Sequence, residues 1–183
     1  MNDNNIKDRK KRIFEYMVFQ LALIGRENGS QNLDLSKLRL QKILFLLAAK
    51  KATGEDPALL TVFDKFYALP YGPVELDIYD SMNANGFDCI RFEGNNCCNF
   101  EDLAPDDFSS LSQEDKQSVD DLIFELKDRI VDYLTMPVFE LVEITHRWTV
   151  WQVAISLANM FGGRSAPMST QEICKSEVKV YSM

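Results

Sequence analysis

The strongest pattern of apolar and polar positions lies between Leu35 and Tyr79. Apolar residues recur there three and four positions apart, which is the spacing of one face of an α-helix. Ser36 is suited to cap the start of this helix, and Gly54 is suited to end it. The apolar stripe comprises Leu40, Ile43, Leu44, Leu47 and Ala48. The pattern therefore predicts a central helix with a broad buried face.

The flanking patterns are shorter and predict further helices with one small β-hairpin. Residues 8–26 are apolar almost all round and predict a heavily buried first helix. After the turn at Tyr71-Gly72-Pro73, Pro73 is suited to be the first residue of a helix that ends near Asn83. Two short apolar runs flank Gly94-Asn95-Asn96 and predict the hairpin, over residues 88–92 and 97–100.

The last third of the chain is expected to be helical. Ser112 with Asp115 three residues later predicts the start of a long acidic helix that ends near Leu134. Three further helices are expected over residues 137–145, over residues 148–160, and after the capping-box sequence Ser169-Thr170-Gln171-Glu172. The fold class is therefore mainly α, a compact single-domain helical bundle with a small β-hairpin, and residues 1–183 are expected to form one domain.

Charge and composition narrow the class of protein. The 183 residues carry a net charge of −8, which disfavours nucleic-acid binding, because phosphate contacts need a basic face. No apolar run is long enough for a membrane span, so no membrane partner is expected. The apolar segment 17–24 is short and lacks a small-residue cleavage site, so no signal peptide is predicted. A cytoplasmic location is the expectation.

Acidic residues are concentrated between Glu101 and Asp132, where eleven of them oppose three basic residues. One interpretation is a solvated helix face. The other is a docking surface that steers a protein partner with a basic surface. The residues expected to carry this steering are Asp120, Asp121, Glu125 and Asp128.

The sequence lacks the residue patterns of common enzymes and metal sites. There is no glycine-rich phosphate loop and no H-E-x-x-H motif. The single histidine, His146, and four cysteines without a C-x-x-C pair do not supply a usual zinc site. His146 is interpreted as a hydrogen-bonding structural residue, with catalysis as the alternative. No enzyme activity, catalytic residue, metal or cofactor is therefore predicted.

Several aromatic residues allow either a structural or a partner-binding interpretation. Tyr71-Gly72-Pro73 forms a rigid turn, or places Tyr71 as an anchor at the edge of a partner groove. Trp148 and Trp151 lie three positions apart on an expected helix, where tryptophan either fills a core or anchors an interface. The candidate partner-binding residues here are Tyr71, Gly72, Pro73, His146, Trp148 and Trp151.

Three short motifs occur in order along the chain: LRLQKILFLLA, then YGPV, then LVEITHRW. Together they resemble the Panacea domain of SocA-like antitoxins and phage-associated proteins, over residues 35–172, with residues 1–30 as an additional N-terminal helix. The matching positions are Leu38, Leu40, Gln41 and Lys42, then Tyr71, Gly72, Pro73 and Val74, then Thr145, His146 and either Trp148 or Trp151. The chain departs from the family pattern in its added first helix, in Trp148 directly after His146-Arg147, and in an acidic insertion over residues 106–132.

The resemblance implies an antitoxin that neutralises a cognate protein toxin by direct contact and performs no catalysis. It also implies that the toxin cannot be named from this chain, because members are paired with chemically unrelated toxins. The alternative function is a protein-interaction adaptor of a phage-derived or mobile element, for example one that presents a partner to a protease. An enzyme activity is the third possibility. A helix-turn-helix repressor lacks a signal, because no basic recognition helix stands out.

Overall fold

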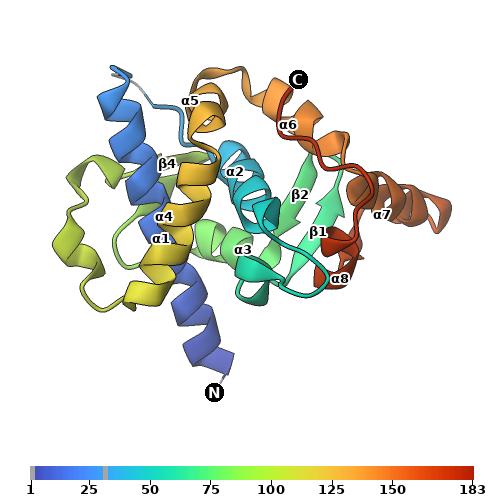
Figure 1. Ribbon diagram of the computed structural model, residues 1–183, viewed down its shortest axis with the longest axis horizontal. Coiled ribbons are helices and arrows are strands. Elements are labelled where there is room, and N and C mark those ends of the chain that lie inside the picture. Colours follow the sequence, from blue (N-terminus) through green and yellow to red (C-terminus); the bar gives the residue numbers. More distant parts are fainter. Residues whose placement is uncertain (1–2, 31–32) are drawn as a thin grey trace. The chain divides into compact units, whose positions relative to one another are not determined.

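The computed structural model describes residues 3–30 and 33–183, which form eight α-helices, three short 3-10 helices and five β-strands (Figure 1). Residues 1–2 of the expected N-terminal segment 1–30 lie outside the described residues. The structure divides into two compact units. One comprises the chain up to Leu40 together with Asp77–Thr135, and the other comprises Gln41–Leu76 together with Met136–Met183. The predicted mainly α class with small β elements is confirmed.

The first unit is built around helix α1 (Asp3–Glu27), which packs against two helices of the segment 101–132 and beyond, of which the first is strongly acidic. These are α4 (Gln113–Glu125) and α5 (Lys127–Thr135). The core of this unit includes the fully buried residues Ile13 and Phe14 of α1 and Ile130 of α5. The remaining elements are α3 (Leu76–Ala84), β3 (Arg91–Glu93), β4 (Asn96–Cys98) and the 3-10 helices η2 (Phe100–Asp102) and η3 (Pro105–Phe108).

The predicted hairpin is confirmed as the antiparallel pair β3–β4, with Phe92 opposite Cys97. The predicted single helix from Ser112 to Leu134 is instead two helices, because Leu126 has a non-helical backbone (φ −107°, ψ 11°) that separates α4 from α5. Ser112 does cap α4, since its side chain accepts a hydrogen bond from the Asp115 N–H.

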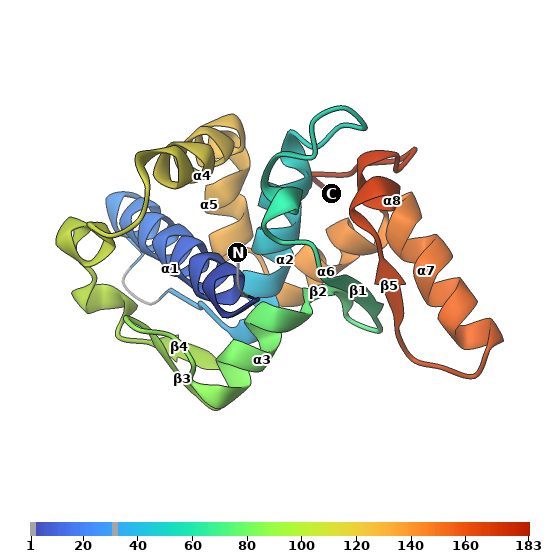
Figure 2. The same cartoon turned by 90° about the horizontal axis from the view of Figure 1, so that it is seen from below.

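The second unit contains a three-stranded antiparallel sheet with strand order β2-β1-β5. Its strands are β1 (Phe66–Leu69), β2 (Gly72–Glu75) and β5 (Ala166–Met168). Helix α7 packs beside β1 and β5, and α6 packs beside β2 (Figure 2). The helices of this unit are the larger part of α2 (Lys37–Lys50), η1 (Ala58–Thr61), α6 (Val138–His146), α7 (Thr149–Met160) and α8 (Thr170–Cys174).

The prediction that Pro73 starts a helix is wrong. Pro73 lies within strand β2, and helix α3 begins only at Leu76. The fixed φ of proline is compatible with a strand at a sheet edge, where the missing N–H breaks no ladder bond. The predicted capping box is confirmed, because Ser169 and Glu172 exchange hydrogen bonds at the start of α8.

An aromatic cluster forms the centre of the second unit. The ring of Phe45 contacts Phe66 and Trp148 edge-on, at centroid distances of 5.4 and 4.8 Å. Trp148 is fully buried, contacts Tyr181, and donates its indole N–H to the Val180 carbonyl at 2.7 Å. This cluster fixes one face of α2 within the unit, through Phe45, which lies beside the apolar stripe that the sequence predicts.

Leu44 lies on this stripe and is almost fully buried. Truncating it to alanine removes apolar contacts and leaves a cavity, so Leu44→Ala should lower the free energy of unfolding by about 2–5 kcal/mol. Chemical denaturation monitored by circular dichroism measures this change. Leu157→Ala is the control, because about half of the Leu157 side chain is exposed and its truncation should have a much smaller effect. Equal effects of the two changes would contradict the placement of α2 in the core.

Candidate functional site

Strand β2 is an edge of its sheet, and its outward backbone groups are paired by helix α2. Leu76 donates its N–H to the Lys65 carbonyl and Val74 lies opposite Tyr67, so alternate residues of β2 point towards β1. Glu75 points the other way. The Gln41 side chain accepts the Glu75 N–H at 2.8 Å and donates to the Glu75 carbonyl at 3.3 Å. A side-chain amide thus takes the place that a neighbouring strand would occupy.

Lys42 pairs with the other outward residue of this edge. Its ammonium group is fully buried and donates a hydrogen bond to the Pro73 carbonyl at 2.7 Å. Pro73 has no N–H, so this bond pairs its one outward backbone group. Burial lowers the pKa of Lys42 from its ordinary value of 10.5 to about 7. Two consecutive helix residues therefore satisfy the outer edge of β2 and exclude a further strand.

Gly72 lets the turn approach the helices closely. Its backbone has φ of +92°, a conformation that side chains with a Cβ rarely adopt. A Cβ at this position would lie 2.6 Å from Thr145 Oγ1 and 2.9 Å from Lys42 Cε. The Thr145 hydroxyl is itself buried and donates to the Val142 carbonyl at 2.7 Å. Glycine is thus required here both by conformation and by space.

Trp151 and His146 contact the segment that leads into the turn. The indole N–H of Trp151 donates to the Leu69 carbonyl at 3.1 Å, and its ring stacks on the His146 imidazole with centroids 3.8 Å apart. Burial lowers the pKa of His146, against the opposing effect of Glu143. Within the described part of the chain, His146 Nε2 is buried without a hydrogen-bond partner. A neutral, stacked imidazole is the state this environment favours.

The turn presents one side chain outward. Tyr71 is 62 % exposed, and its ring meets the ring of Phe139 edge-on, with centroids 6.2 Å apart. Phe139 is itself 61 % exposed. Glu143, one helical turn after Phe139 on α6, is also exposed. We call Tyr71, Phe139 and Glu143 the aromatic-acidic face.

These contacts join the three sequence motifs in one unit: Gln41 and Lys42, the turn at Gly72-Pro73, and Thr145 with His146. A family model matches residues 40–152 and is described as the antitoxin SocA-like, Panacea domain. The chain belongs to this family. The match covers more than half of the chain and includes all of these residues. No curated protein and no solved structure matches the chain.

Most of the Panacea motif residues therefore lie inside the protein. Gly72 and Pro73 are buried, and Trp148 is fully buried and has no surface to offer a partner. Trp151 and His146 are partly exposed at the rim. Tyr71 alone among the predicted aromatic anchors is widely exposed. The sequence analysis missed Phe139 and Glu143, although Phe139 falls off the buried stripe of α6, which is the signal that marks an exposed aromatic residue.

The acidic residues predicted to steer a partner lie in the first unit, on α4 and α5. Asp121, Glu125 and Asp128 are exposed. Asp120 is partly buried, because the Tyr16 hydroxyl donates to its carboxylate at 3.0 Å. A fifth acid, Asp115, is buried in an ion pair with Arg9 at 2.6 Å, so the acidic segment is not a uniformly solvated face.

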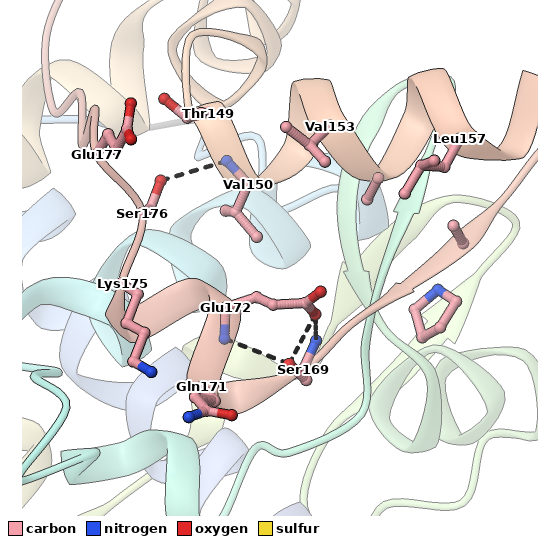
Figure 3. A pocket seen from close by; sticks show the side chains of 13 residues that line it. Thr149, Val150, Val153, Leu157, Ser169, Gln171, Glu172, Lys175, Ser176 and Glu177 are labelled. Atoms are coloured by element: carbon pink, nitrogen blue, oxygen red, sulfur yellow. Dashed lines mark hydrogen bonds between the residues drawn. The ribbon is translucent and has the colours of Figure 1, made fainter.

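A groove of about 610 Å³ lies along α7 in the second unit (Figure 3). Val150, Val153 and Leu157 of α7 form one wall, and the opposite side contains Glu172 of α8 and Lys175, the residue after α8. The Ser176 hydroxyl accepts the Val150 N–H at 3.2 Å, which links the segment after α8 to the start of α7. The groove adds an apolar surface to the second unit.

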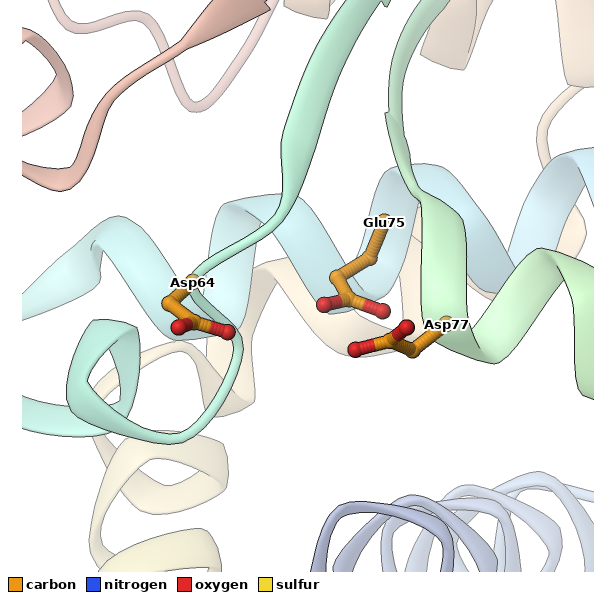
Figure 4. A group of neighbouring side chains, drawn as sticks. All are labelled: Asp64, Glu75 and Asp77. Carbon is orange, nitrogen blue, oxygen red and sulfur yellow. The ribbon is translucent and has the colours of Figure 1, made fainter. Parts of the chain in front are cut away.

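Two carboxylates of the second unit, Asp64 and Glu75, have oxygen atoms within 4.8 Å of each other (Figure 4). Glu75 is fully buried, and one of its oxygens accepts the Lys65 N–H at 3.3 Å, while Asp64 is exposed. Neighbouring acidic groups are common without a bound metal ion, so this pair does not by itself indicate a metal site.

The close approach at Gly72 generates a stability prediction. Gly72→Ala should lower the free energy of unfolding by about 2–5 kcal/mol, because it adds backbone strain and a steric clash with Thr145. Gly162→Ala is the matched control, since Gly162 has φ of +72° but no atom within 4 Å of an added Cβ. Its cost should be strain alone, about 1–2 kcal/mol. Thermal unfolding compares them, and equal losses would contradict the clash.

The buried ammonium group of Lys42 generates a pH prediction. Its pKa is about 7 in the folded state and 10.5 ordinarily, so between these values the unfolded chain binds more protons. The stability contributed by Lys42 should therefore be lowest below pH 7 and should rise as the pH increases towards 10.5. Denaturant unfolding of the wild type and of Lys42→Met across this range measures it. A stability difference that does not change with pH would contradict this protonation behaviour.

Proposed function

We propose that the protein neutralises a cognate toxin by binding it directly, in a stoichiometric complex and without catalysis. Membership of the antitoxin SocA-like, Panacea domain family is the observation that carries the proposal. The arrangement of the motif residues supports it. Their hydrogen bonds serve the fold, and the side chain that the turn exposes is a rigidly held aromatic residue, the type that dominates binding energy at protein interfaces.

The test begins with the reading frame adjacent to the gene in its genome. Expression of that frame alone should arrest growth, and co-expression of this protein should restore it. The purified proteins should then form a complex of fixed stoichiometry by size-exclusion chromatography. An adjacent frame that is harmless, or a toxic frame that this protein neither rescues nor binds, would overturn the antitoxin function.

The adaptor alternative makes a different prediction about the fate of the toxin. An adaptor that presents its partner to a protease lowers the amount of that partner, whereas a binding antitoxin leaves the amount unchanged while toxicity disappears. Immunoblotting of the toxin during rescue separates the two. The same co-expression with His146→Ala tests the absence of catalysis: a folded variant that binds the toxin but no longer rescues growth would contradict stoichiometric neutralisation.

We also propose that four acids of α4 and α5, three of them exposed and Asp120 partly buried, steer a toxin with a basic surface. Opposite charges accelerate encounter, and salt weakens this effect. Neutralising Asp120, Asp121, Glu125 and Asp128 together should slow association several-fold, flatten its salt dependence, and leave dissociation within a few-fold of the wild type. Stopped-flow or surface-immobilised binding at several salt concentrations measures both rates.

A second variant controls for the effect that a lower net charge alone has on the association rate. It carries glutamine at four exposed acidic positions elsewhere in the chain and so loses the same number of charges: Glu27, Glu55, Glu93 and Glu177. Asp120→Asn by itself controls for the lost Tyr16 hydrogen bond. An association rate that falls equally in both four-site variants, or in neither, would contradict steering by the acids of α4 and α5.

A further inference from the structure

In the described part of the chain, several aromatic rings are covered by the cationic group of a lysine or arginine, whereas the exposed ring pair of Tyr71 and Phe139 is not. Phe124, a similarly exposed aromatic on α4, has the Lys127 ammonium group 4.8 Å above its ring. Tyr181 and Phe108 are likewise covered by Lys50 and Arg12. Among the residues that the structure describes, no cation lies over Tyr71 or Phe139. Their electron-rich faces therefore remain open to solvent.

The same face carries negative charge, and the residues that the structure describes place no lysine or arginine in an ion pair with Glu143. Glu143 is 61 % exposed and lies 3.6 Å from His146 Nδ1, but the lowered pKa of His146 leaves that imidazole neutral near pH 7. Glu140 is exposed on the same helix. Arg147, one turn after Glu143, makes no ion pair with it in the described part of the chain. An open aromatic pair beside an unneutralised carboxylate is complementary to a flat cation.

We propose that the aromatic-acidic face binds an arginine side chain that the toxin presents, an inference that rests on the proposed antitoxin function. The guanidinium plane stacks on the open face of Tyr71 or Phe139, and its N–H groups donate to the Glu143 carboxylate. Arginine fits better than lysine, because its planar, weakly hydrated fork combines stacking with two parallel hydrogen bonds. A toxin with a basic substrate-binding surface has such residues available.

The rigidity of the support strengthens this assignment. Tyr71 is held by Gly72, which packs against Lys42 and Thr145, and by the Leu69 carbonyl bonded to Trp151. Phe139 and Glu143 stand on one helix, four residues apart. Little conformational entropy is lost when groups held in this way are covered by a partner. The face is thus organised before the partner arrives.

The first experiment needs no toxin. Aromatic-region NMR spectra of the protein are recorded during titration with N-acetyl-argininamide and, separately, with N-acetyl-lysinamide. The arginine compound should shift the ring resonances of Tyr71 and Phe139 more than the lysine compound does, and Glu143→Gln should reduce these shifts. Equal responses to the two compounds, or shifts in the same degree at Phe124, would overturn the preference for arginine at this face.

The second experiment measures the dissociation constant of the complex with the toxin from the adjacent reading frame. Tyr71→Ala, Phe139→Ala and Glu143→Gln should each weaken binding about tenfold. Phe124→Ala, which removes an equally exposed ring on α4, should leave it within about twofold. Unchanged melting temperatures establish that the variants remain folded.

The two proposals fail in different ways. If no toxin is found, the antitoxin function fails and the NMR comparison still decides whether the face prefers arginine. If the toxin binds and is neutralised, but the three face variants bind it as the wild type does, the assignment of this face is overturned while the antitoxin function stands. Loss of binding in the two aromatic variants but not in Glu143→Gln would overturn recognition of a cation and leave an apolar contact.

Discussion

The structure of the second unit depends on satisfying the outward backbone groups of strand β2. A buried sheet edge is unfavourable unless its N–H and C=O groups find partners, because each unpaired group retains the full penalty of leaving water. Gln41 supplies a donor and an acceptor to Glu75, and Lys42 supplies a donor to Pro73. Two successive helix residues thus pair with alternate residues of the strand, Gln41 with Glu75 and Lys42 with Pro73.

This pairing explains why the sequence predicted the helices better than the turn. Periodicity and capping are local, so the apolar stripe of α2, the hairpin and the Ser169 capping box were readable from neighbouring residues. Pro73 is compatible with either a helix start or a strand edge, and the choice is made by β1 and by Lys42, thirty-one residues away. The conformation at such positions depends on partners that are distant in the sequence, and local sequence patterns do not reveal these partners.

The candidate site was predictable to a similar, limited extent. The exposed anchor Tyr71 stood out because an aromatic residue beside Gly-Pro is held rigidly wherever it points. Trp148 and Trp151, alike in sequence, differ in the structure, since Trp148 joins the Phe45 cluster while Trp151 spans from α7 to the turn. The exposure of Phe139 can be predicted only when the buried face of α6 is known. In a short helix, the residues that face solvent are those opposite the face that packs on the core.

The buried motif residues and the exposed residues of the second unit tolerate substitution differently. Gln41 and Lys42 bond to the edge of β2 at Glu75 and Pro73. Gly72 lies so close to Lys42 and Thr145 that a Cβ there would clash with both, so a change at one of these positions disturbs its neighbours. Tyr71, Phe139 and Glu143 touch solvent, so a change at one of them should leave the unit folded. A buried ammonium group is an expensive way to pair one carbonyl, and a hydrophobic residue would avoid its desolvation. What Lys42 adds is a directional hydrogen bond to Pro73, two residues after the exposed Tyr71. Rigid internal contacts beneath an exposed surface allow residues of that surface to change while the fold is kept.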